Sequence, residues 1–247
     1  MILSLISFLL NLLTDALLRI HSMTSILTIY ILTVLSINGE SVKNWEKYRQ
    51  YLESGDFHLH TNYTHGENTV KEMCEQAILN NLKLVAFTEH VRREISYDYN
   101  AFLSDIEEAR RLYPAIKILS GCEAAVRDTE GRIDVSSEIL DKAEIVVASF
   151  HNFPYGRKED FLSAVHGLIK NPRVDIWAHP VTFLRNVDLT QDELEDIVRA
   201  CIKNSVLIED SLSPIYRAPE FISMAKRLGA TIVRNSDAHD IYSMKRL

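Results

Sequence analysis

The sequence predicts an α/β protein whose parallel strands form a closed or nearly closed barrel. From Asp56 onward, short apolar runs and helical patterns alternate seven times over about 190 residues. Six of the seven runs end in a residue that can bind a metal ion. A barrel gathers the carboxyl ends of all its strands on one face, whereas a doubly wound open sheet binds its ligands at a single crevice. We therefore predict the barrel, and the open sheet is the alternative.

The predicted strands are short apolar runs, most of them rich in Val and Ile. Strands that are buried on both faces of a parallel sheet have this composition. The runs cover residues 57–59, 84–87, 116–119, 145–147, 174–177, 206–208 and 231–233. Together they account for the seven strands of the predicted barrel.

Three stretches outside these runs predict helices. Residues 41–55 are polar and predict a helix that ends at Gly55. Residues 70–78 and 194–202 carry apolar side chains at the i, i+3, i+4, i+7 and i+8 positions, which is the spacing of an amphipathic helix. These helices alternate with the strands as a barrel requires.

Helix boundaries are marked by residues with known preferences for helix ends. Thr190 and Glu193 form a capping box at the start of the second amphipathic helix. Pro219 suits the first turn of a further helix, and Gly229 is placed to end it. These signals place a helix on each side of the sixth predicted strand.

The composition is that of a globular protein with a full core. The chain has 247 residues, 47% of them hydrophobic, and a formal charge of −7. It has no stripe of Lys and Arg, so a nucleic-acid partner is not expected, although bound cations would reverse the charge at a site. Cys74, Cys122 and Cys201 are far apart and odd in number, which favours a reducing compartment and hence the cytoplasm.

The first 37 residues differ from the rest of the chain. Two apolar runs, 1–18 and 23–37, are each short of the roughly 20 apolar residues that span a bilayer. Three interpretations stay open: a membrane anchor through residues 1–37, helices added to the domain, or a leader foreign to the natural protein. We treat residues 1–40 as an extension and residues 41–247 as the functional domain.

Histidine and acidic side chains gather where the apolar runs end. The motifs are H-x-H at 58–60, T-E-H at 88–90, G-C-E at 121–123, S-F-H at 149–151, A-H-P at 178–180 and S-D-A-H at 236–239, with His65 just beyond the first. Imidazole and carboxylate are ligands for Zn, Mn and Fe. A barrel would bring these motifs together, so the spacing predicts one site that holds several metal ions.

These six motifs, in this order, resemble those of the PHP (polymerase and histidinol phosphatase) family, from Asp56 to the C-terminus. The resemblance implies a distorted (β/α)7 barrel, similar to a TIM barrel, with ligands at the carboxyl ends of the strands. It also implies two or three divalent metal ions, either Zn, Mn or Fe, and hydrolysis of a phosphoester by a metal-bound hydroxide. We find no protein nucleophile in the sequence.

The resemblance also implies how the ligands are shared among three metal positions. The first position would use His58, His60, Glu123 and Asp237. Glu123 would bridge to a second position with His151 and His179, and the third would use His65, His90 and His239. A carboxylate has two oxygens, so Glu123 can link two cations about 3.5–4 Å apart.

Three further side chains have open roles. Arg157 and Arg185 follow the fourth and fifth strand ends, and a guanidinium suits the oxygens of a phosphate, so both are candidates for binding the substrate. Glu89 precedes His90 and either orients a ligand or is a solvated loop charge.

We predict a PHP-type phosphoesterase that hydrolyses a small phosphomonoester, as histidinol phosphatases do. The alternatives are a nuclease-like phosphodiesterase, which the charge of −7 disfavours, and a metal-binding module without activity. The expected partner is a small phosphorylated substrate.

Overall fold

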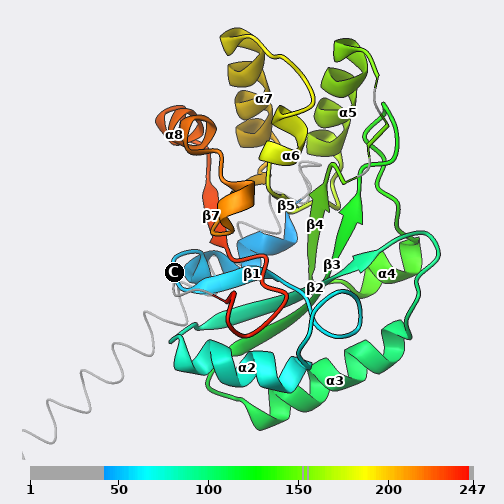
Figure 1. Cartoon of the computed structure of the whole chain (residues 1–247), viewed down its shortest axis with the longest axis vertical. Helices are drawn as coiled ribbons and strands as arrows, with labels where there is room; N and C mark the ends of the chain where they lie inside the picture. The colour runs from blue at the N-terminus through cyan, green and yellow to red at the C-terminus, as the bar shows by residue number, and fades with distance from the viewer. Residues whose placement is uncertain (1–41, 152, 155, 245–247) are drawn as a thin grey trace, which may run out of the picture. The chain divides into compact units, whose positions relative to one another are not determined.

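Seven parallel strands in sequential order form the sheet of the computed structural model, which describes residues 42–151, 153–154 and 156–244 (Figure 1). The strands are β1 (Gly55–Leu59), β2 (Leu84–Val91), β3 (Lys117–Ala125), β4 (Ile145–Ser149), β5 (Ile176–Trp177), β6 (Leu207–Ser211) and β7 (Ile232–Asn235). A parallel bridge joins Leu59 to Ala238, and the His60 N–H donates to the Ala238 carbonyl at 2.9 Å. The sheet is therefore a nearly closed barrel, and the predicted fold class is confirmed.

Helices alternate with the strands and surround the barrel (Figure 1). They are η1 (Asn44–Tyr51), α2 (Val70–Leu79), α3 (Tyr99–Leu112), α4 (Ser137–Lys142), α5 (Lys158–Lys170), α6 (Val181–Leu184), α7 (Gln191–Lys203), η2 (Pro214–Tyr216) and α8 (Pro219–Arg227), where η marks a 3-10 helix. The polar stretch 41–55 thus contains a 3-10 helix, but the predicted end at Gly55 is wrong, because the helix ends at Tyr51 and Gly55 begins β1. Thr190 and Glu193 form the expected capping box of α7, and Pro219 lies in the first turn of α8.

Side chains alternate between two buried apolar clusters along β2 to β7, as the two-residue period of a strand requires. On β2, Leu84 and Ala86 belong to the cluster inside the barrel, while Val85 and Phe87 belong to the cluster between the strands and the helices. Both faces of the sheet are covered, which explains the continuous apolar runs of the sequence.

Trp45 of η1 closes the amino-terminal end of the barrel. Its side chain is buried and belongs to the inner cluster. Its backbone N–H donates to the Asp175 carboxylate at 3.1 Å, and its indole N–H donates to the Ser205 carbonyl at 2.7 Å. Because Asp175 and Ser205 precede β5 and β6, η1 is attached where these strands begin, opposite the predicted metal site.

Two ionisable residues, Lys43 and Asp175, are buried beside Trp45, the side chain that we call the plug of the barrel. Lys43 Nζ donates to the carbonyls of Asn171 and Val174 at 2.8 and 2.7 Å. Burial lowers the pKa of Lys43 to about 8, although the Asp175 carboxylate opposes this change. Burial raises the pKa of Asp175 to about 6, although backbone N–H groups that donate to it act in the opposite direction.

The predicted extension, residues 1–40, lies outside the described residues, as does the tether proposed for residues 1–37. Among residues 42–151, 153–154 and 156–244, no helix is both long enough and apolar enough to cross a bilayer. The membrane anchor and the cytoplasmic location stay predictions.

Candidate metal centre

The carboxyl ends of the strands bring the predicted ligands together. His90 and Glu123 lie near the ends of β2 and β3, and the other predicted ligands lie on β1 or in the segments that follow β1, β4, β5 and β7. The contacts of these side chains with one another connect all of the predicted ligands: His58, His60, His65, His90, Glu123, His151, His179, Asp237 and His239.

Glu123 lies at the centre of the site and is buried. Its Oε1 atom is 3.3 Å from Nε2 of both His151 and His179. Its Oε2 atom is 2.8 Å from His90 Nδ1 and 3.5 Å from Nε2 of both His58 and His60. The two oxygens therefore face two different sets of imidazoles, which is the arrangement that a bridging carboxylate needs.

Asp237, in the segment that follows β7, provides a second carboxylate. Its Oδ1 atom lies 3.2 Å from His60 Nε2, 3.5 Å from His58 Nε2 and 3.8 Å from His239 Nδ1. Asp237 and His179 both adopt positive φ angles, 52° and 26°, which are unusual for residues other than glycine. Such strained backbone often occurs at functional sites, where surrounding contacts hold it in place.

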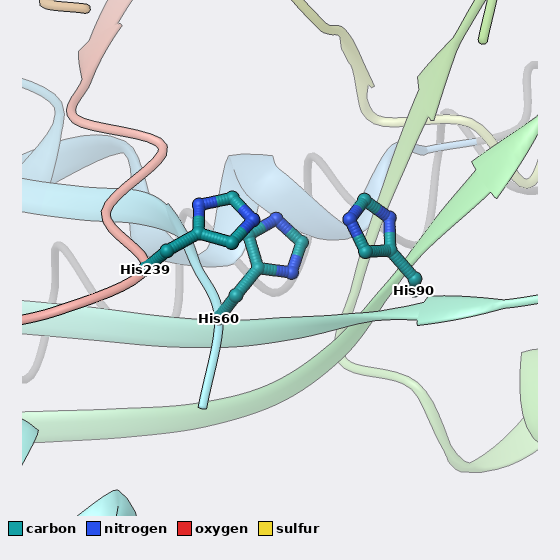
Figure 2. Close-up of side chains that lie close together, drawn as sticks. All are labelled: His60, His90 and His239. Carbon is teal, nitrogen blue, oxygen red and sulfur yellow. The ribbon is translucent and has the colours of Figure 1, made fainter. Parts of the chain in front are cut away.

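Three imidazoles from distant segments form a compact group, which Figure 2 shows turned toward one another. The His60 ring stacks on His90 at 4.3 Å and on His239 at 4.4 Å between ring centroids. Nitrogen atoms of these three rings lie within 4.8 Å of one another. His65 is exposed, and its ring centroid is 5.1 Å from that of His90. The structure thus groups His60 with His90 and His239, where the resemblance implies His65.

The chemistry of the buried atoms fits a metal site. Within the described part of the chain, seven buried atoms of the site make no hydrogen bond: His58 Nε2, His60 Nδ1 and Nε2, His90 Nδ1, Glu123 Oε1 and Oε2, and His179 Nε2. Buried polar atoms without partners are costly and rare in folded proteins. Cations bound to these nitrogen and oxygen atoms would satisfy them, so the donor set suits divalent metal ions.

The electrostatics of the site also follow from this concentration of charge. Burial lowers the pKa of His58, but the carboxylates of Glu209 and Asp237 outweigh this effect and raise it well above its ordinary value. Burial lowers the pKa of His60 to about 3. Burial raises the pKa of Asp237, but His58 and His60 outweigh burial and bring it to about 2. Carboxylates that stay ionised and an imidazole that stays neutral are suited to bind cations.

Glu209 on β6 is a buried carboxylate that the motif analysis did not assign to the site. Its Oε1 atom is 2.8 Å from His58 Nδ1 and accepts a hydrogen bond from Asn235 Nδ2 at 2.8 Å. Its Oε2 atom accepts from the His179 backbone N–H at 2.7 Å. Glu209 therefore connects two proposed ligands. Glu209 directly follows the sixth apolar run, 206–208, and this position is the sequence signal that it shares with the other motifs.

Asp210 and Glu89 have structural roles outside direct ligation. Asp210 follows Glu209 on β6, so its side chain points to the other side of the strand, where it lies 3.8 Å from Lys226 Nζ. Glu89 is buried and accepts hydrogen bonds from the Thr61 N–H at 2.8 Å and the Thr64 hydroxyl at 2.5 Å. It therefore holds the loop that leads to His65, and the solvated loop charge considered from the sequence is wrong.

The two arginines considered as substrate contacts make other contacts in the structure. The Arg157 side chain is 79% exposed and pairs with Asp160 at 3.1 Å at the start of α5. Arg185, just after α6, donates from Nη2 to the Ile215 carbonyl at 2.8 Å. Their binding of a substrate stays a prediction.

Tyr216 at the end of η2 lies beside the site without a motif to mark it. Its ring centroid is 4.8 Å from that of His179. Burial raises the pKa of Tyr216, and the negative charges of Asp237 and Glu123 raise it further. The phenol therefore stays protonated next to the carboxylates of the site.

The barrel and its cluster of imidazoles and carboxylates define a metal-dependent hydrolase, and comparison with known proteins gives the family. Residues 56–211 match the PHP domain, and the chain belongs to the PHP domain family. A protein of Acetivibrio thermocellus named as a probable phosphatase is 31% identical over 201 residues, which cover 77% of this chain and 81% of the relative. A protein of Shewanella sp. strain ANA-3, also named as a probable phosphatase, is 28% identical over 200 residues, which cover 76% and 77%.

Solved structures share the same fold. A histidinol phosphate phosphatase from Lactococcus lactis, solved with Zn, L-histidinol and phosphate, matches with a TM-score of 0.58 and 19% identity over 76% of this chain and 87% of that chain. A candidate histidinol phosphatase from Listeria monocytogenes matches with a TM-score of 0.62 and 16% identity over 78% and 97%. The predicted membership of the PHP family is confirmed, and the chain is a hydrolase of the phosphatase class.

Proposed function

We propose that this protein hydrolyses a small phosphomonoester at the metal centre described above. The observation that carries the proposal is the set of buried, unpartnered imidazole and carboxylate atoms around Glu123. The named relatives support phosphatase chemistry. The zinc, L-histidinol and phosphate in the Lactococcus lactis structure support a small phosphorylated substrate and make zinc a candidate metal.

The proposed ligands divide around the two oxygens of Glu123. His58 and His60 face one oxygen and, with Asp237 beside them, would hold the first metal ion, while His151 and His179 face the other and would hold the second. His90 and His239 would hold the third, with His65 or His60 completing the group. Divalent ions bound here would supply an activated water and neutralise the oxygens of the phosphoryl group.

Glu209 would prepare His58 for this task. Its carboxylate accepts the Nδ1 proton of His58, which leaves the lone pair on Nε2, the atom that faces Glu123 and Asp237. The same carboxylate holds the backbone N–H of His179. Glu209 therefore orients ligands of both the first and the second metal positions.

A substrate panel tests the proposal and separates it from its alternatives. We expect purified protein supplied with Zn or Mn to hydrolyse one or more of L-histidinol phosphate, nucleotides and sugar phosphates, and a chelator to abolish this activity. Hydrolysis of diesters such as bis(para-nitrophenyl) phosphate in preference to monoesters, with steep salt dependence on polynucleotides, would instead show a phosphodiesterase. Metal binding without hydrolysis of any ester would show a binding module.

A further inference from the structure

Tyr216 presents an unused hydrogen-bond donor at the rim of the metal centre. Its ring lies against His179, with 4.8 Å between centroids and 32° between the ring planes. The side chain is half-buried, and its hydroxyl makes no hydrogen bond to any residue that the structure describes. A phenol in this position is available to a ligand that enters the site.

The short helix that carries Tyr216 is braced from the neighbouring loop. Arg185 Nη2 donates to the Ile215 carbonyl at 2.8 Å, and the Tyr216 N–H donates to the Ser213 carbonyl at 3.0 Å. Pro214 begins η2 and restricts its backbone. Because α6 directly follows His179, Arg185 links η2 to the segment that carries this proposed ligand. The phenol and the imidazole are therefore positioned together.

The charge of the site makes a neutral donor useful at this point. Glu123 and Asp237 would repel a phosphate ester, and bound divalent cations would offset this repulsion. A protonated phenol donates a hydrogen bond without adding negative charge. Within the described residues, the imidazole nitrogens and carboxylate oxygens near Tyr216 face one another, whereas its hydroxyl has no acceptor.

We propose that Tyr216 contacts the substrate and that its hydroxyl donates a hydrogen bond to a non-bridging oxygen of the phosphoryl group. Arg185 is then a positioning residue: it holds η2 and does not contact the substrate itself. This inference rests on the proposed function, and its test has a readout apart from hydrolysis.

Binding of inorganic phosphate to the metal-loaded protein tests the contact directly. We expect Tyr216→Phe to weaken phosphate binding, measured by calorimetry, about tenfold, as loss of one hydrogen bond to a charged oxygen predicts. The control is Tyr113→Phe, which removes a hydroxyl that donates to Glu75 at 2.9 Å beyond the end of α3. Unchanged phosphate affinity in Tyr216→Phe, with metal content intact, would overturn the proposal.

A series of phosphomonoesters with different leaving groups identifies which part of the substrate Tyr216 contacts. We expect kcat/KM of Tyr216→Phe to fall by the same factor with phenyl, para-nitrophenyl and alkyl phosphates. A loss confined to one leaving group would place the hydroxyl elsewhere and refute the phosphoryl contact. If no ester is hydrolysed but phosphate binding still weakens in Tyr216→Phe, the proposed function fails while the contact stands.

A double-mutant cycle tests the role of Arg185. If Arg185 acts through η2, Arg185→Gln weakens phosphate binding alone but adds little in the Tyr216→Phe background, and Arg185→Lys restores part of the affinity. Fully additive losses would show that Arg185 contacts phosphate itself.

Discussion

At the scale of single residues, the two oxygens of Glu123 separate the imidazoles of the site into two sets. One oxygen faces His151 and His179, and the other faces His58, His60 and His90. A carboxylate in this position can serve two cations at once. The loss of its charge would therefore affect more than one of the proposed metal positions.

Replacing Glu123 is expected to disable the centre. In Glu123→Gln, the shape of the side chain remains but its charge is lost. We therefore expect the variant to bind at least one equivalent of metal fewer than the wild type, and kcat/KM to fall on the order of 100-fold or more. Elemental analysis and a phosphatase assay measure both effects. Glu107→Gln, on the exposed face of α3, is the control and should change neither. Full metal content and activity in Glu123→Gln would contradict the bridging role.

Replacing Glu209 tests how the ligands are oriented. The single oxygen of a Gln amide can accept hydrogen bonds either from His58 and Asn235 or from the His179 N–H. In either orientation, its NH2 group points at the remaining donor or donors, with which it cannot hydrogen-bond. We expect Glu209→Gln to lower metal affinity roughly 10–100-fold in a competition assay with a chelator. Asp210→Asn changes the adjacent, outward-facing carboxylate and should bind metal as the wild type does.

The clustering of His58, Glu123, His179 and Asp237 could be predicted from the sequence better than their neighbours could. Each lies in or just after an apolar run, and parallel strands bring such positions to one face. Tyr216 lies on a three-residue 3-10 helix, and its approach to His179 depends on loop geometry that no sequence period encodes. For the same reason, the grouping of His60 with His90 and His239 emerges only in three dimensions.

At the scale of secondary-structure elements, η1 contributes a core residue from outside the strand–helix alternation. Trp45 fills the amino-terminal end of the barrel and hydrogen-bonds with segments that precede β5 and β6. The polar composition of residues 41–55 predicts a helix, but not that one of its side chains enters the barrel. Tertiary packing, which local patterns do not contain, decides this.

Truncation of Trp45 should destabilise the fold while sparing the metal centre. We expect Trp45→Ala to lower the free energy of unfolding by about 3–5 kcal/mol, measured by urea titration, because a large buried side chain is lost. Trp45→Phe keeps most of the volume but leaves the Ser205 carbonyl without its donor, so a smaller loss of about 1–2 kcal/mol is expected. Both variants should retain kcat/KM at temperatures where they are folded. A loss of metal in either variant would contradict the expectation that Trp45 stabilises the fold without affecting the metal centre.

The helices show the same division between local and tertiary information. The boundaries of α7 and α8 follow from the Thr190–Glu193 capping box and from Pro219, which act on nearby backbone groups. The four-residue helix α6 after His179 has too few residues for a periodic pattern. It begins two residues after His179, where φ is positive, with Pro180 at its amino end.

At the scale of the whole described domain, chemistry and stability lie at opposite ends of the barrel. The proposed metal ligands lie at the carboxyl end of the strands, and the buried Lys43 and Asp175 lie beside Trp45 at the amino end. This separation is common in α/β barrels, where strand ends on one face act in catalysis and those on the other in stability. The part of the pH dependence that comes from Asp175 can therefore be measured by comparison with a variant of that residue.

Asp175 should make the domain less stable as pH rises from about 4 to 6. Its pKa is raised from 3.8 to about 6 in the folded protein, so over this range the folded state holds a proton that the unfolded state has lost. The free energy of unfolding contributed by this group then falls with pH by at most about 1.4 kcal/mol per unit. Urea titrations across this range should show that the difference in the free energy of unfolding between the wild type and Asp175→Asn shrinks as pH increases. Asp141→Asn, at an exposed ion pair with Arg173, should show no such trend.

We propose that distant side chains converge on Glu123 to hold several metal ions. The most direct measurement is elemental analysis of the purified protein, combined with a phosphomonoesterase assay before and after chelation. We expect two to three equivalents of Zn, Mn or Fe, with activity that disappears with the metal and returns when it is restored. Full phosphatase activity in protein that contains less than one equivalent of metal would contradict it.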